Sequence, residues 1–200
     1  MQIFSKRISI ILLLIIQAFT VMAITTEKQK YRLVKSEKEF EIRYYPAATL
    51  ATVFTSAKSY KEIASPGFRK LAGFIFGGNE TNTKISMTAP VHMDINDSMS
   101  AMSFVMPSEY EDKTLPSPND SEVILGKSDA EYVAAIRFRG YASDADIKRY
   151  SEKLKSHLIE RGISYHGNFR FLGYNPPYQF IGRRNEIIVS VDWQENSHAH

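Results

Sequence analysis

The chain has 200 residues, of which 44% are hydrophobic and 24% are charged, and it contains no cysteine. This length is enough for one domain with its own core, and the composition excludes a disulfide framework and a cysteine-built metal site. Lys6 and Arg7 are two of the 25 basic residues, and the other 23 nearly balance the 22 acidic ones. This balance gives no basic surface for nucleic acid, so we expect no nucleic-acid partner.

The first 23 residues have the pattern of a signal peptide. A basic pair, Lys6 and Arg7, precedes an apolar run from Ile8 to Ile16, and Val21-Met22-Ala23 offers a small-residue cleavage site. We therefore predict a signal peptide over residues 1–23, a single domain over 24–193 and a flexible tail over 194–200. A periplasmic or secreted protein follows from this prediction.

An uncleaved membrane anchor is the alternative for the N-terminal segment. Gln17 and Thr20 interrupt its apolar run, which is marginal against the roughly 20 residues that a membrane span needs. Cleavage is therefore favoured, and we expect no stable membrane span after it.

Residues 25–30 are polar and are expected to form a flexible lead-in. Beyond them, alternating apolar residues or β-branched and aromatic runs predict strands. The predicted strands span residues 31–34, 40–45, 49–54, 84–95, 101–106, 122–126, 131–139, 170–174 and 186–191.

A first helix is predicted from Ser65 as the N-cap, with Pro66 in the first helical position, to the Gly77-Gly78 pair that stops it. The helical period places four apolar residues on one stripe that can dock on a sheet, namely Phe68, Leu71, Ala72 and Ile75. Phe74 and Phe76 fall on opposite flanks of this stripe, beside Lys70 and Arg69. Aromatic residues next to cations suit a flat, apolar, anionic ligand.

A second helix is predicted from Ser143 as the N-cap to Gly162. Strands, a helix and two further strands thus occur twice along the chain, without a repeat of the residues themselves. This order predicts an α+β fold, a distorted and mainly antiparallel β-barrel of two βαββ halves with two packed helices.

Several blocks resemble the SOUL haem-binding protein family in both order and spacing. They are FEIRYYPAATLATV, FRKLAGFIFGGNETNTKISMTAPV, SFVMPSEY, YVAAIRFRGYAS and FLGYNPPYQFIGRRNEIIVSV. The resemblance extends over residues 31–191, and it implies the two-βαββ barrel and the binding of haem or another tetrapyrrole without enzymatic activity.

The resemblance also implies a haem surface made by the first helix and a late loop. The residues carried over to it are Phe68, Arg69, Leu71, Ala72, Ile75, Phe76, Tyr174, Pro177 and Tyr178. Some relatives carry a histidine, proposed as an axial iron ligand, in the strand that here reads Ile42-Arg43-Tyr44-Tyr45. Tyr44 occupies that position, so a tyrosinate ligand to ferric haem is one interpretation and a packed tyrosine is the other.

His92 is a further candidate ligand, since Asp94 two residues later can orient its ring, but an exposed strand histidine is the simpler interpretation. The sequence holds no Gly-x-Ser-x-Gly elbow and no phosphate-binding glycine loop. Our hypothesis is an exported, non-enzymatic, reversible carrier or scavenger of haem or related tetrapyrroles. The alternative is a module on the same scaffold that binds other apolar small molecules or a protein.

Overall fold

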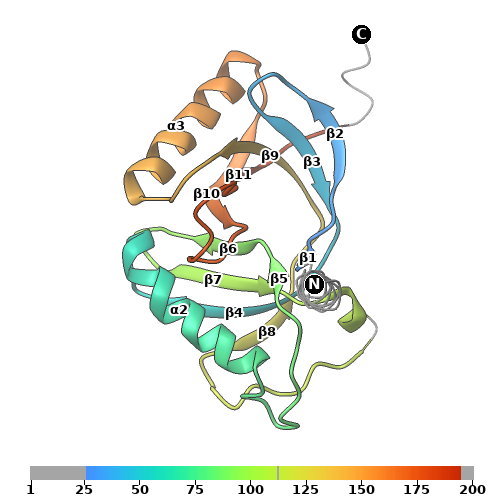
Figure 1. Cartoon of the computed structure of the whole chain (residues 1–200). Coiled ribbons are helices and arrows are strands. Elements are labelled where there is room, and N and C mark those ends of the chain that lie inside the picture. The colour runs from blue at the N-terminus through green and yellow to red at the C-terminus, as the bar shows by residue number, and fades with distance from the viewer. Residues whose placement is uncertain (1–25, 112, 195–200) are drawn as a thin grey trace, which may run out of the picture.

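The computed structural model describes residues 26–111 and 113–194 (Figure 1). The predicted signal peptide and residues 195–200 of the predicted tail lie outside the described residues. The helices are α2 (Tyr60–Ile75) and α3 (Asp144–Glu160), with a short 3₁₀ helix η1 (Ser108–Tyr110). The strands are β1 (Glu27–Lys28), β2 (Arg32–Ser36), β3 (Glu41–Tyr45), β4 (Thr49–Thr55), β5 (Thr88–Ala89), β6 (Val91–Asp94), β7 (Ser100–Val105), β8 (Ile124–Lys127), β9 (Glu131–Phe138), β10 (Tyr165–Gly173) and β11 (Asn185–Val191).

Nine strands form one antiparallel sheet in the order β2-β3-β9-β11-β10-β6-β7-β4-β8. The α+β class and the two βαββ units are confirmed, as β4-α2-β6-β7 and β9-α3-β10-β11. The predicted barrel is not closed. The strand order runs from edge strand β2 to edge strand β8, and no pairing among the described residues joins those two edges.

The two units exchange strands. β3, which leads into the first unit, pairs with β9 of the second, whereas β8, which leads into the second unit, pairs with β4 of the first. The units meet in the middle of the sheet, where β10 pairs with β6. Each unit therefore completes the sheet of the other.

Helix α2 begins six residues earlier than the sequence predicts. Ser59 is its N-cap, and the Ser59 side chain accepts a hydrogen bond from the backbone N–H of Glu62 at 3.3 Å. A Ser followed three residues later by a Glu is the capping-box pattern. Pro66 consequently lies inside the helix and not at its first position. Helix α3 begins after its predicted N-cap, Ser143.

Both helices cover the same side of the sheet, α2 over β4 and β7, and α3 over β9, β10 and β11 (Figure 1). The main core lies between helices and sheet and includes Leu71, Phe74 and Ile75 of α2 and Leu154 and Leu158 of α3. The prediction for Phe74 was therefore wrong, because this ring is buried against the sheet and does not flank a ligand.

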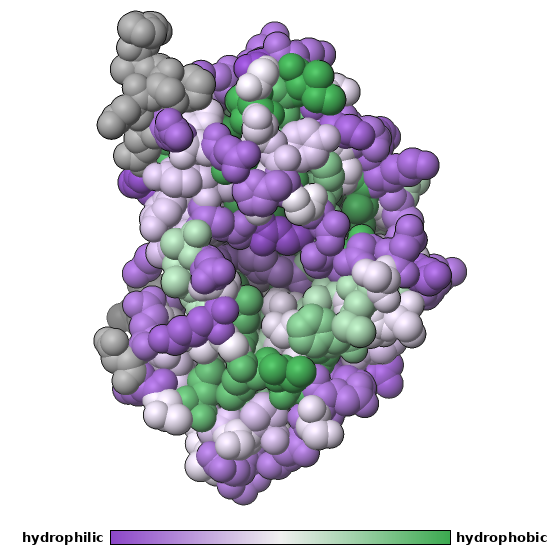
Figure 2. Space-filling model, turned by 180° about the vertical axis from the view of Figure 1, so that it is seen from behind, coloured by the Kyte–Doolittle hydropathy of each residue, from purple (hydrophilic) through white to green (hydrophobic). Residues whose placement is uncertain are grey.

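The opposite side of the sheet carries a smaller apolar cluster mixed with buried charges. A segment predicted as a flexible lead-in crosses this side. Its strand β1 pairs with β5, and the backbone N–H of Gln29 donates to the carbonyl of Ala89 at 2.8 Å. Figure 2 shows polar residues in a band across the middle of the molecule, with apolar surface below the band and a smaller apolar area near the top. In the part of the chain that is described, neither helix is long and apolar enough to cross a membrane.

Candidate functional site

One flank of α2 presents aromatic surface. Phe68, Ala72 and Phe76 recur at intervals of four residues, so they share a stripe beside the buried face. Phe68 is 37% exposed and Phe76 is 64% exposed. The other flank is polar, since Lys70 forms an ion pair with Glu122. The flank that includes Phe68 and Phe76 is therefore the apolar one available to a ligand.

Three of the helix residues carried over to the haem surface are buried instead. Leu71, Ala72 and Ile75 face the sheet and leave almost no side-chain surface to solvent. This placement is the one that the helical period predicts for a docking stripe. These residues hold α2 on the sheet. They do not contact a ligand, and affect its binding only by positioning the helix. Arg69 is exposed and contacts Ser65 within the helix.

The loop over residues 174–184, between β10 and β11, is the second apolar surface. Tyr178, Phe180 and Ile181 are 76%, 78% and 88% exposed, and Pro177 is exposed as well. Large apolar side chains with this exposure are typical of a binding surface when they occur together. The resemblance identified Pro177 and Tyr178 but not Phe180 and Ile181.

A buried arginine shapes this loop from below. Arg183 donates through Nη1 to the carbonyls of Pro176 and Gln179, at 2.7 and 2.9 Å. Its guanidinium also lies 4.3 Å from the ring centroid of Tyr141, whose hydroxyl donates to the carbonyl of Pro177 at 3.0 Å. The apolar tip is therefore supported by side chains and not only by its own backbone.

The base of the loop lies near the N-terminal end of α2, since the charge of Arg183 acts on the hydroxyl of Tyr60, the first residue of that helix. Asp144, in the first turn of α3, accepts from the backbone N–H of Tyr60 at 2.5 Å, and the Tyr60 ring contacts Phe171 of β10. At 1.5 Å per residue, Phe68 lies about 12 Å and Phe76 about 24 Å along the helix from Tyr60. No contact between described residues joins Phe76 to the loop. Phe76 lies at the C-terminal end of α2 and the loop lies near its N-terminal end, so these two parts of the predicted haem surface are apart.

Tyr174, also carried over to the haem surface, belongs to a buried polar network. Its hydroxyl donates to Oε2 of Glu186 at 2.9 Å. Arg43 donates to both oxygens of the same carboxylate, at 2.7 and 3.0 Å, and Arg184 donates at 2.7 Å. Burial raises the pKa of the Tyr174 hydroxyl. This side chain therefore stabilises the start of the loop and presents no free hydroxyl to a ligand.

The charge of Glu186 is retained despite complete burial. Burial alone would raise its pKa, but hydrogen bonds and charge from Arg43, and then from Arg184, hold the pKa of the carboxyl below its usual range. Arg43 and Glu186 are only 2% and 0% exposed. The ion pair links β3 to β11 across β9, the strand that lies between these two strands.

Tyr44 lies on β3, in the half that carries α3. Its ring contacts Tyr132 of β9, with centroids 5.0 Å apart, and the guanidinium of Arg32 lies 5.4 Å from its centroid. Among the described residues no contact joins Tyr44 to α2 or to the 174–184 loop. Its role as an iron ligand stays a prediction.

His92 is partly buried rather than exposed. Its Nε2 lies 2.7 Å from Oε1 of Gln29, on the segment that crosses the sheet. Burial, and then the charge of Arg170, lowers the pKa of His92 to about 4, so the ring is neutral at pH 7. Within residues 26–111 and 113–194, no three His, Asp or Glu side chains are grouped so as to hold a metal ion.

The sequence reasoning missed Tyr141, Phe180 and Ile181. A signal was present in the segment Pro176-Pro177-Tyr178-Gln179-Phe180-Ile181-Gly182. Prolines and glycine mark it as a loop, and a loop rarely buries three large apolar side chains. Their exposure was therefore predictable, whereas the support by Arg183 depends on the fold.

Known proteins are similar to this chain over most of its length. Residues 26–190 match the family described as SOUL heme-binding protein. Heme-binding protein 1 of Xenopus laevis is 31% identical over 173 residues, which cover 80% of this chain and 90% of that protein. Heme-binding protein 2 of Mus musculus is 30% identical over 157 residues, covering 74% of this chain and 76% of that protein.

Solved structures share the fold at much lower identity. The crystal structure of the EcmrR C-terminal domain has a TM-score of 0.59 and 9% identity, and covers 82% of this chain and 99% of its own. A hydrolase from Listeria innocua has a TM-score of 0.55 and 9% identity, covering 79% of this chain and 94% of its own. At these identities the likeness concerns the fold alone. The match over residues 26–190, in contrast, is a family match, and the chain belongs to the SOUL heme-binding protein family.

Proposed function

We propose that this protein is a non-enzymatic, reversible carrier or scavenger of haem or a related tetrapyrrole. The observation that supports it best is the exposed apolar tip of the 174–184 loop, with Tyr178, Phe180 and Ile181 on a supported backbone. Phe68, which is 37% exposed on the apolar flank of α2, is a second apolar group on the predicted haem surface. The names of the relatives agree with this ligand class.

The expected affinity is moderate. A porphyrin that hides about 300 Å² of apolar area gains roughly 7 kcal/mol at about 25 cal/mol per Å². Association costs of at least about 4 kcal/mol reduce this gain. Without a strong bond from the protein to iron, the dissociation constant should be micromolar or weaker. Such affinity suits uptake and release better than a permanently held cofactor.

A hemin titration followed at the Soret band tests the proposal. We expect a shifted and saturable band at one hemin per chain. Replacing Tyr178 and Phe180 together with Ala should weaken binding at least tenfold, because both rings lose their contact with the macrocycle. Phe54→Ala, which removes a half-exposed ring on β4, is the matched control and should bind as the parent does.

The same titration tests Tyr44. Loss of the shifted band in Tyr44→Phe, with the fold intact, would identify Tyr44 as the iron ligand. Linear absorbance without saturation, equal to that of hemin in buffer, would exclude the haem site. The alternative module, for other apolar ligands or a protein, is favoured by the packing of Tyr44 against Tyr132 and would then be the one to pursue.

Export is part of the proposal. It is supported by the basic and apolar pattern of residues 1–23, and a location in the periplasm or outside the cell follows from it. Mass spectrometry of the protein recovered from its native cells should give a mature chain that begins at Ile24. Recovery with Met1 or Gln2 at the N-terminus would contradict cleavage.

A further inference from the structure

The apolar side chains at the tip of the 174–184 loop project far into solvent. Tyr178, Phe180 and Ile181 are 76%, 78% and 88% exposed. The ring of Tyr141, which contacts that of Phe180, is 53% exposed. A flat ligand covers such side chains from one side only, so much of their apolar area stays in water. Removing that area from water requires surroundings that enclose each side chain.

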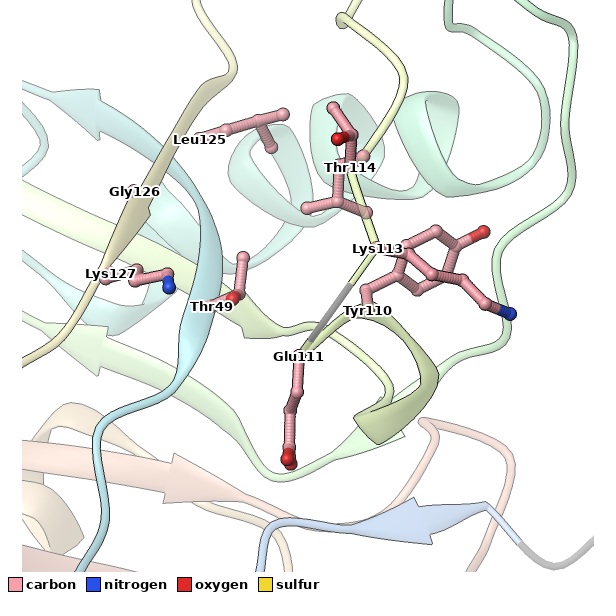
Figure 3. A pocket seen from close by; sticks show the side chains of 9 residues that line it. Thr49, Tyr110, Glu111, Lys113, Thr114, Leu125, Gly126 and Lys127 are labelled. Carbon is pink, nitrogen blue, oxygen red and sulfur yellow. The ribbon is translucent and has the colours of Figure 1, made fainter.

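Two hollows of the described residues do not include this tip. One lies between β4, β8 and the residues around η1, and Figure 3 shows Thr49, Tyr110 and Leu125 of its lining. A smaller hollow lies beside β1. No residue of the 174–184 loop lines either of them. The tip is therefore a projecting surface, which suits an occupant that surrounds it.

The backbone of the tip is suited to apolar surroundings. Four of its carbonyls accept hydrogen bonds from side chains, those of Pro176, Pro177, Gln179 and Ile181. Arg183 donates two of these bonds, and Tyr141 and Gln179 donate one each. An unpaired carbonyl costs free energy when it leaves water, so these bonds reduce the cost of insertion. The two prolines have no N–H that would need an acceptor.

Basic residues outnumber acidic ones around the tip. The segments concerned are residues 58–62, 137–149 and 174–186, which together contain eight basic and four acidic residues. Side-chain hydrogen bonds join the first segment to the second and the second to the third. An anionic surface therefore complements this end of the molecule better than a neutral one.

Part of this positive charge has no partner. Arg137 and Arg139 are exposed and form no ion pair with any described residue. Among the acidic residues, Asp146 pairs with Arg149 at 2.6 Å, and the buried Glu186 is compensated by two arginines. The exposed arginines are thus available to phosphate groups.

We propose that the tip of the 174–184 loop docks on an anionic lipid bilayer. Tyr178, Phe180 and Ile181 enter the interface between headgroups and acyl chains, where tyrosine is common in membrane proteins. Arg137 and Arg139 lie against the lipid phosphates. The inference rests on the proposed function in one respect, since the surface that binds the tetrapyrrole then takes it up from the bilayer.

A fluorescent label tests insertion of the tip. The chain has no cysteine, so Ile181→Cys can carry a single environment-sensitive NBD label. Vesicles of POPC and POPG in a ratio of 3:1, without hemin, should shift its emission to the blue and at least double its intensity. The same label on Phe54→Cys, at a half-exposed position of β4, should not respond. No response at residue 181, or equal responses at the two positions, would overturn the inference.

Co-sedimentation with vesicles tests the contributions of the side chains. Replacing Phe180 and Ile181 together with Ser should weaken binding to the 3:1 vesicles at least tenfold, whereas Phe54→Ser should bind as the parent does. Arg139→Gln should weaken binding to these vesicles about fivefold and leave binding to pure POPC unchanged. Lys38→Gln, which removes an exposed cation between β2 and β3, should change neither.

The vesicle assays contain no hemin and the hemin titration contains no vesicles, so the two proposals can fail separately. Hemin binding without vesicle binding at millimolar lipid would overturn this inference alone and would favour a protein as the partner of the tip. Vesicle binding without hemin binding would refute the proposed function and leave the docking surface in place.

Discussion

Mild acid should destabilise the protein through His92. In the folded protein, burial and the nearby Arg170 lower the pKa of His92 from its ordinary 6.5 to about 4. Below pH 6.5 the unfolded chain binds a proton at this ring, whereas the folded protein binds one only near pH 4. The free energy of unfolding therefore falls as the pH drops through this window, and it is fully retained above it.

The pKa shift sets the size of this effect. One pKa unit corresponds to about 1.4 kcal/mol, so the whole shift is worth about 3 kcal/mol. Between about pH 7 and about pH 4.5 most of this is lost, which gives an expected decrease of about 2 kcal/mol from His92 alone. Glu131 and Glu186 also have lowered pKa values, so both carboxyls add to the loss of stability at the acid end of this range. The charge of His92 contributes to the lowered pKa of Glu131, so His92→Gln also changes that smaller contribution.

Urea unfolding of the parent and of His92→Gln at the two pH values measures the effect. The variant should lose about 2 kcal/mol less than the parent on acidification, because its amide does not titrate. His166→Gln removes an exposed histidine and should behave as the parent does. An equal loss in the parent and in His92→Gln would refute the reasoning.

Two further substitutions test the buried polar groups by the same urea assay. Arg43→Met should destabilise the protein by about 3–5 kcal/mol, because Glu186 is left buried with its charge only partly compensated, and adding Glu186→Leu should restore part of the loss. A cost below about 1 kcal/mol for Arg43→Met would contradict a buried pair. Asn79→Ala removes two hydrogen bonds that the amide donates, to the carbonyl of Phe74 near the C-terminal end of α2 at 3.0 Å and to the carbonyl of Thr83 in the next loop at 2.8 Å. It should cost about 2 kcal/mol, whereas the exposed Asn119→Ala should cost little; equal effects would contradict the structural role of Asn79.

The sequence predicted the two helices because their periodic apolar residues and one serine cap are local signals. The cap of α3 at Ser143 was confirmed. The predicted start of α2 was wrong because Pro66 favours a first helical position, whereas Ser59 and Glu62 carry the actual capping pattern. The bond from Tyr60 to Asp144 spans 84 residues and has no local signal at all.

The ligand surface stays a prediction, and the structure shows only which of its residues are accessible. Phe68, Phe76, Pro177 and Tyr178 are exposed, as a ligand surface requires. For Leu71 and its neighbours on the stripe, helical periodicity and family resemblance gave different roles, and their burial agrees with the periodicity.

The network around Glu186 was beyond sequence reasoning. Arg43 and Glu186 are separated by 143 residues, and charged residues of both signs are common in strands that face solvent. Only the sheet order, which puts β9 between β3 and β11, brings the two side chains together. Tyr174 was consequently expected at the surface, although Glu186 holds its hydroxyl inside.

Because β3 and β8 are exchanged between the two units, the units cannot separate without breaking strand pairing in the sheet. Separating the units would break the β3–β9 and β4–β8 ladders and the central β6–β10 ladder together. A hinge needs a few residues that bend while both sides stay intact, and this topology does not offer one. We therefore expect surface segments, above all the 174–184 loop, to change conformation for ligands of different size, while the sheet keeps its conformation.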